Sequence, residues 1–203
     1  MKREWCRIIA VLALVLAPNL IGAQEKKADI LVERDLVYGK GGDADLKLDL
    51  AMPRDGTGPF LAIVCVHGGG WKSGKRQDLG KTIEGMAARG YVAVTVSYRF
   101  SPAAKFPAQI EDCKAAVRWL RANAKKYRVN PERIGAFGYS AGGHLACLLG
   151  TTDKNDGLEG SGGNPDQSSR VQAVVSYFGP TDFTTKNWSD EVEKMVLIPL
   201  LGA

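Results

Sequence analysis

Hydrophobic and polar positions along the chain predict two kinds of β-strand. Residues 45–50 alternate strictly between polar and apolar side chains, which is the period of a strand with one buried face. We expect them to pair antiparallel with a strand over residues 30–38 through the glycine-rich residues 39–43. Apolar runs typical of strands buried on both faces follow at residues 61–66, 91–96 and 134–137, with a further strand expected over 171–178.

Helical patterns separate these later strands. Residues 77–89 place apolar side chains on one face, and Gly90 is expected to end that helix. A longer helix over residues 108–127 repeats apolar positions at helical spacing, and we interpret Glu111 and Asp112 as its solvent-exposed side. Two opening strands followed by alternating helices and strands predict an α/β fold, with a mostly parallel sheet covered by helices on both faces.

The composition fits one globular domain that follows a leader. Hydrophobic residues make up 45% and charged residues 24% of the 203 positions, which is typical of a single folded domain. Residues 1–23 open with Lys2 and Arg3, continue with an apolar core too short to span a bilayer, and end in small residues. We predict a secretory signal peptide there, with an uncleaved anchor as the alternative. Residues 24–203 would then be secreted or periplasmic, with no stable membrane span after cleavage.

Charge and cysteine content exclude some classes of protein. The net charge is +5, of which residues 1–23 contribute +2, and no basic stripe with interleaved aromatic residues occurs. We therefore expect no nucleic-acid partner. Cys6 lies in the predicted leader, and the remaining three cysteines cannot all pair internally, so we expect free thiols. No C-x-x-C or histidine-rich spacing indicates a metal site, and no cofactor is implied.

One short motif indicates nucleophilic chemistry. The segment Gly138-Tyr139-Ser140-Ala141-Gly142 joins a predicted strand to a predicted helix, which is the context of a nucleophile elbow. Glycine on both flanks leaves room where a Cβ would collide with neighbouring backbone. The helix N-terminus beside the serine favours developing negative charge. We predict that Ser140 is a nucleophile; the alternative is a glycine-rich turn with an incidental serine.

A second motif, His67-Gly68-Gly69-Gly70-Trp71, directly follows the first apolar strand. Glycines allow backbone N–H groups to face an open site, and acyl transfer requires such donors where a carbonyl oxygen becomes negative. The carboxyl ends of parallel strands meet at one edge of a sheet, so this loop is expected beside Ser140. The predicted oxyanion donors are the amides of Gly69, Gly70 and Ala141, and His67 is expected to support the loop by hydrogen bonds.

Taken together, the two motifs resemble those of the α/β-hydrolase esterases of the hormone-sensitive-lipase type. In particular, the chain is similar to secreted bacterial carboxylesterases that include acetylxylan- and feruloyl-esterase-like members, and the resemblance covers residues 30–203. It implies an α/β-hydrolase fold and an acyl-enzyme on Ser140. It also implies a small-molecule or polysaccharide-linked ester as the substrate. A histidine base, oriented by an acidic residue, would complete the mechanism.

The chain departs from that family pattern at the base. In this fold the acid and then the histidine follow the serine, but the sequence has only His67, before the serine, and His144, in the first helical turn after it. Neither is expected to act as the base, and Asp182 is interpreted as a turn or cap residue. The apolar tail over residues 196–201 has no predicted strand partner. We therefore interpret the chain as a C-terminally truncated hydrolase that lacks the last strands, the acid and the base.

Two other readings stay open at this point. One is a catalytically inactive truncated product or binding remnant, because loss of a triad member in a serine hydrolase removes most of the rate. The other is a peptidase or an acyltransferase of the same fold, because one fold supports several chemistries.

Overall fold

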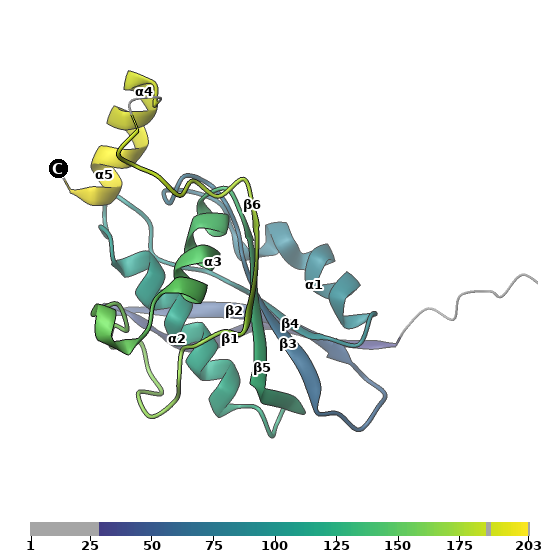
Figure 1. Cartoon of the computed structure of the whole chain (residues 1–203). Helices are drawn as coiled ribbons and strands as arrows, with labels where there is room; N and C mark the ends of the chain where they lie inside the picture. The colour runs from purple at the N-terminus through teal and green to yellow at the C-terminus, as the bar shows by residue number, and fades with distance from the viewer. Residues whose placement is uncertain (1–28, 186–187, 203) are drawn as a thin grey trace, which may run out of the picture.

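The computed structural model describes residues 29–185 and 188–202, which build a six-stranded sheet in the order β1-β2-β4-β3-β5-β6 (Figure 1). The strands are β1 (Ile30–Gly41), β2 (Ala44–Pro53), β3 (Phe60–Val66), β4 (Val92–Val96), β5 (Val129–Tyr139) and β6 (Ala173–Tyr177). β2 pairs antiparallel with both β1 and β4, whereas β4, β3, β5 and β6 run parallel. The predicted hairpin and the predicted mostly parallel sheet are confirmed. The predicted signal peptide lies outside the described residues.

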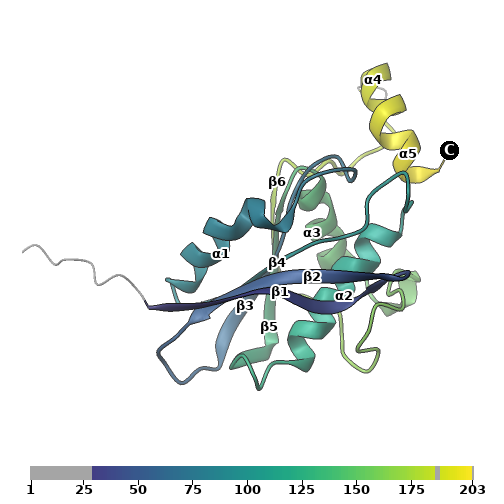
Figure 2. The same ribbon diagram turned by 180° about the vertical axis from the view of Figure 1, so that it is seen from behind.

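Helices cover both faces of the sheet, with α1 on one face and α2 and α3 on the other (Figures 1 and 2). They are η2 (Arg76–Leu79), α1 (Gly80–Ala87), α2 (Ala108–Ala122), α3 (Ala141–Thr151) and η3 (Lys154–Asp156). A last helical segment extends beyond the end of the sheet (Figure 1) and comprises α4 (Asp190–Val192), one π-helical turn η4 (Glu193–Leu197) and α5 (Ile198–Leu201). The predicted helix over residues 77–89 forms as η2 and α1, and Gly90 after it has a φ of 93°.

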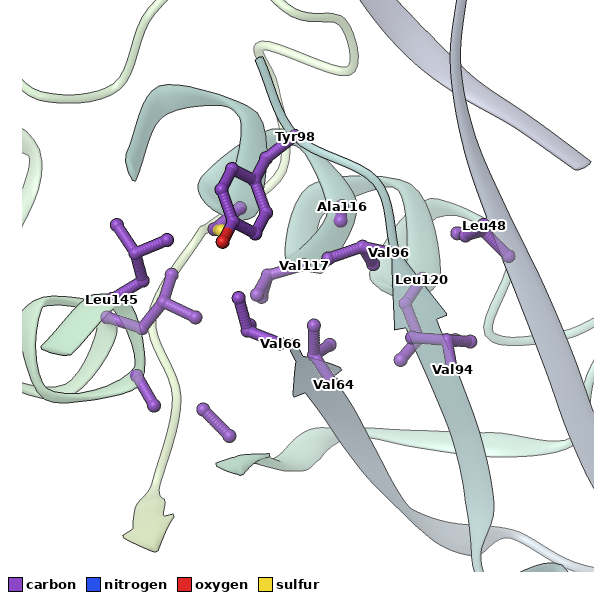
Figure 3. Packing of buried hydrophobic residues seen from close by; sticks show 14 of the residues in the cluster. Leu48, Val64, Val66, Val94, Val96, Tyr98, Ala116, Val117, Leu120 and Leu145 are labelled. Atoms are coloured by element: carbon purple, nitrogen blue, oxygen red, sulfur yellow. The ribbon is translucent and has the colours of Figure 1, made fainter. Parts of the chain in front are cut away.

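The largest core cluster lies between the sheet and α2 and α3. Side chains of the two central parallel strands β3 and β4 point toward α2 (Figure 3), and they meet side chains of that helix. None of these side chains has exposed surface; they are Val64, Val66, Val94 and Val96 of the strands and Val117 and Leu120 of α2. Burying one such side chain stabilises the fold by about 1.5–3 kcal/mol. The apolar runs therefore form the buried central strands predicted for them, and the ends of these strands are held in fixed positions.

The alternating pattern of β2 does not leave one face in water. Asp49 is fully buried, and its Oδ1 accepts hydrogen bonds from Arg76 Nε and from the backbone N–H of Asp35, both at 2.9 Å. A buried carboxylate requires such partners, because an unpaired buried charge is strongly destabilising. The expectation of a half-buried strand is therefore wrong around Asp49, where η2 and α1 cover the polar face.

The interpretation of Asp112 as a solvent-exposed residue of its helix is also wrong. Its side chain is 1% exposed, and its carboxylate accepts bonds from the Arg99 guanidinium at 2.7–3.0 Å and from the Arg99 backbone N–H at 2.8 Å. Glu111 also accepts from Arg99, at 3.2 Å. This charge-assisted pairing fixes the loop after β4 onto α2, and the same loop carries Tyr98.

A second buried charge cluster fixes the loop between α3 and β6. Lys114 and Arg118 of α2 are 1% and 3% exposed, and both contact the carboxylate of Glu159, at 2.8 and 2.7 Å. Ser169 also donates to Glu159, at 2.7 Å. The glycine-rich loop that the sequence shows between these elements is therefore anchored through α2.

The three cysteines in the described region are free thiols, as predicted. Cys65 and Cys113 are buried, and Cys147 is half-buried. Among the helices of the described region, none combines the length and the apolar character needed to cross a membrane.

Candidate active site

Ser140 occupies a sharp turn between β5, which ends at Tyr139, and α3, which begins at Ala141. Its φ of 52° and ψ of −126° lie in a region that L-residues rarely adopt. The turn is held by the Ser140 N–H, which donates to the carbonyl of Tyr177 in β6 at 2.7 Å. The Ser140 side chain is exposed and stands at the N-terminus of α3. This is the strained elbow that the sequence predicts.

The glycines of the elbow are required by close backbone contacts. A Cβ on Gly138 would lie 2.1 Å from the carbonyl oxygen of Gly142. A Cβ on Gly142 would lie 2.1 Å from the carbonyl oxygen of Val66, at the end of β3. Helix α3 therefore begins in direct contact with β3, which brings Ser140 next to the loop that follows β3.

The glycine loop after β3 lies against the elbow, as predicted. A Cβ on Gly68 would lie 3.1 Å from the Cβ of Ser140. Gly70 and Ala141, two of the three predicted oxyanion donors, line one pocket together with Ser140. Gly69 does not line that pocket; it has a φ of 119°, and its carbonyl accepts from the N–H groups of Lys72 and Ser73. The structure thus brings Gly70, Ala141 and Ser140 together, and places Gly69 in the turn that shapes the loop.

His67 is fully buried at the start of this loop. Its Nδ1 lies 2.7 Å from the carbonyl oxygen of Gly68, so Nδ1 donates the hydrogen bond. The ring stacks on Tyr98 at a centroid distance of 4.6 Å, and the Tyr98 hydroxyl donates to the His67 carbonyl at 3.0 Å. Burial lowers the pKa of the imidazole. These contacts agree with a supporting position for His67.

His144 packs into an aromatic cluster next to Ser140. Its ring meets Trp71 and Phe183 edge-on, at centroid distances of 5.3 and 5.1 Å. Burial lowers the pKa of His144 to about 4, so the ring is neutral at pH 7. Within residues 29–185 and 188–202, neither His144 nor another acid or base is hydrogen-bonded to the Ser140 hydroxyl. Sequence reasoning missed this cluster, which joins the glycine loop, α3 and the loop after β6.

Asp182 forms a turn, in agreement with its interpretation from the sequence. Its Oδ1 accepts from the hydroxyl of Thr184 at 2.7 Å and from the Thr184 N–H at 2.8 Å. These bonds hold the pKa of the carboxyl below its usual range. The carboxylate stabilises its own loop through these bonds.

The last helical segment forms a wall of the pocket, which the sequence did not predict. The pocket has a volume of about 270 Å³, and Trp188, Val192 and Val196 line it opposite Gly70 and Ala141. Leu197 and Leu200 of the same segment are buried in the main core. The predicted tail without a strand partner is therefore helical and packed. The signal in the sequence was the i, i+4 spacing of the two valines.

No group of three or more His, Cys, Asp or Glu side chains within the described part of the chain is arranged to hold a metal ion. The site itself offers an exposed serine at a helix N-terminus, with the backbone of Gly70 and Ala141 beside it. Together with the parallel sheet, this arrangement defines an α/β-hydrolase site.

Known proteins agree with this class. The BD-FAE family matches residues 48–203, and the chain belongs to that family. LipM of Mycobacterium tuberculosis, a probable carboxylic ester hydrolase, is 34% identical over 175 residues, covering 85% of this chain and 39% of LipM. The chain thus spans about two fifths of that relative.

Solved structures of esterases show the same fold. The bifunctional GH43-CE protein of Bacteroides eggerthii is 34% identical with a TM-score of 0.71, covering 85% of this chain and 26% of that protein. Est2, an esterase of Thermogutta terrifontis solved with propionate bound, is 30% identical with a TM-score of 0.69, covering 86% of this chain and 63% of Est2. Both of these solved structures match the chain at 30% identity or more, which agrees with its place in the BD-FAE family.

Proposed function

We propose that Ser140 is the nucleophile of a carboxylic ester hydrolase. The observation that carries this proposal is the strained, exposed elbow serine that shares a pocket with Gly70 and Ala141. The Ser140 oxygen attacks the ester carbonyl carbon and gives up its proton to a base, and the alcohol leaves with a proton as the acyl-enzyme forms. Water then cleaves the acyl-enzyme and regenerates the serine.

The backbone of the site stabilises the charge that develops on the carbonyl oxygen. The amides of Gly70 and Ala141 act as donors, and Gly69 shapes the loop that presents them. One such donor contributes about 3–4 kcal/mol to lowering the barrier. The N-terminus of α3, which is eleven residues long, adds a favourable dipole at the same point.

The acid and the base are proposed to come from residues outside these 203. Both histidines of the sequence are packed in other contacts. β6 is the last strand in the sheet order of the described residues, so its outer edge has no neighbouring strand there, and another strand would normally cover such an edge. Val175 and Tyr177, which share one face of β6, are also about half exposed. The chain is, on this proposal, a fragment of a longer hydrolase. An open reading frame past the codon for Ala203 that encodes an acid and later a histidine would support this, and an immediate stop codon would refute it.

The proposed substrates are short acyl esters of small alcohols or of sugar hydroxyls. Two observations support this class: one relative of known structure, the Est2 esterase, holds propionate, and another is a carbohydrate esterase from gut microbiota. Export of the protein through a signal peptide at residues 1–23 is proposed from the basic start and the apolar core of that segment. N-terminal sequencing of exported protein should begin at Gln24.

The test uses free imidazole in place of the missing base. Loss of one triad member reduces kcat by about a millionfold and leaves about a thousandfold over water, so the 203-residue chain alone should be nearly inactive toward 4-nitrophenyl acetate. Because Ser140 is exposed, added imidazole should raise its turnover above the imidazole background measured with Ser140→Ala. Equal rates in both proteins, together with no labelling of Ser140 by a fluorophosphonate in imidazole, would refute the proposal and favour an inactive remnant.

A further inference from the structure

We propose that Val192 and Val196 set the size of the acyl group that the site accepts and restrict it to short chains. The inference rests on the proposed ester hydrolysis at Ser140, because the same pocket contains the serine and both valines. It assigns a role to the last helical segment, which supplies one wall of the site from a part of the chain about fifty residues after the nucleophile.

The chemistry of the pocket fits an uncharged, apolar group. Apart from the Ser140 hydroxyl, every side chain that lines it is apolar or aromatic. The indole N–H of Trp188 is already committed, because it donates to the carbonyl of Asp182 at 3.3 Å. The indole N–H of Trp71, which also lines the pocket, is buried without a partner among the described residues and can pair one hydroxyl. The other hydroxyls of a sugar alcohol would stay without partners here, at a cost of about 1–3 kcal/mol for each buried group. The acyl half of the ester is therefore the half that suits this pocket.

The two valines are placed where they limit length. They lie one helical turn apart on the half-buried side of the segment. Val196 Cγ1 is 3.5 Å from the position that a Cβ on Gly70 would take, so the gap between the wall and the glycine loop has little spare width. The whole pocket, at about 270 Å³, is smaller than the roughly 300–1,000 Å³ of sites for drug-sized ligands.

The wall is held in a fixed position relative to the glycine loop. The ammonium group of Lys72, which follows that loop, donates to the carbonyl of Met195 at 3.1 Å. The N–H of Phe106 donates to the carbonyl of Leu200 at 2.8 Å, and the Leu200 side chain is 1% exposed. A wall anchored at these two points can discriminate by size, because close-packed protein yields little to an oversized group.

The first experiment measures kcat/KM for 4-nitrophenyl acetate, butyrate and hexanoate with imidazole present. Val196→Phe and Val192→Phe should lower the butyrate-to-acetate ratio at least about tenfold, because one methylene in such a pocket is worth about 10–200-fold. Val196→Ala should raise the hexanoate-to-acetate ratio. The matched control is Met195→Phe, in the same turn, because the Met195 side chain is 57% exposed and does not line the pocket. The ratio cancels any general loss of activity.

A second experiment does not depend on turnover. In Ser140→Ala protein, butyrate is titrated against the indole N–H resonance of Trp188, which lines the pocket. Val196→Phe should weaken butyrate binding at least about tenfold, and Met195→Phe should leave it unchanged. Equal affinities in these two variants would overturn the assignment of the wall. If Val196→Phe changed kcat/KM only along a series of alcohols, from methyl to hexyl acetate, and not along the acyl series, the assignment of this pocket to the acyl group would be overturned. Absence of Ser140-dependent turnover with butyrate binding intact would refute only the proposed hydrolysis.

Discussion

The substitution Gly142→Ala tests the contact between the elbow and β3. The added Cβ would lie 2.1 Å from the carbonyl oxygen of Val66 and 2.5 Å from that of His67. Val66 cannot withdraw, because β3 pairs with β4 on one side and with β5 on the other. The start of α3 must therefore move. Overpacking costs about 1–3 kcal/mol, and a backbone obstacle places this site at the upper end. For a chain of this size, about 3 kcal/mol corresponds to a fall in Tm of about 6–12 °C.

Thermal melting followed by circular dichroism measures this change, and Gly80→Ala is the matched control. Gly80 opens α1 with helical φ and ψ of −55° and −49°, and a Cβ there meets nothing within 4 Å. That variant should gain about 0.4–1 kcal/mol. Movement of Ser140 in Gly142→Ala should also lower imidazole-assisted turnover about a hundredfold, as for a displacement of about 1 Å. A Gly142→Ala protein that melts with the parent would refute the reasoning.

Two further substitutions probe buried ionisable side chains. The pKa of His144 falls from about 6.5 in the unfolded chain to about 4 in the fold. Its contribution of about 3 kcal/mol to the free energy of unfolding is therefore complete above pH 6.5 and is lost as the pH falls from 6.5 to 4. His144→Phe should flatten the fall in urea midpoint between pH 7 and pH 5, and an unchanged slope would contradict this. Glu159→Gln leaves Lys114 and Arg118 without their carboxylate and should cost about 3 kcal/mol in urea unfolding, whereas exposed Asp166→Asn in the same loop should change stability by less than about 0.5 kcal/mol.

The parts of the fold that could be predicted are those set by local pattern. The elbow and the glycine loop can be recognised from short motifs, because a Cβ on Gly69, Gly138 or Gly142 would lie 2.1 Å from a backbone oxygen. The central strands follow from their apolar runs. The order of the loops at the sheet edge then follows from parallel pairing, so Ser140 and Gly70 could be placed together without a structure.

The parts that could not be predicted depend on partners distant in the chain. Asp112 has the sequence pattern of a surface residue, and only the structure shows that Arg99, thirteen positions earlier, forms hydrogen bonds with its carboxylate. The helix predicted to reach Tyr127 ends at Ala122, and turns continue to Arg128, whose φ of 55° ends the helical geometry. The pocket wall was missed because its partner, the glycine loop, lies more than a hundred residues away.

The hydrogen bond from the Ser140 N–H to the carbonyl of Tyr177 has a consequence for the order of folding. The strained turn depends on β3, which carries the carbonyl that α3 abuts, and on β6, which accepts this bond. β3 lies about seventy residues before Ser140 in the chain and β6 about forty residues after it. Contacts between residues so far apart in sequence form slowly. Ser140 therefore takes its final geometry only after β3, β5 and β6 have paired, and a partly folded chain carries this serine without the strained turn that exposes it.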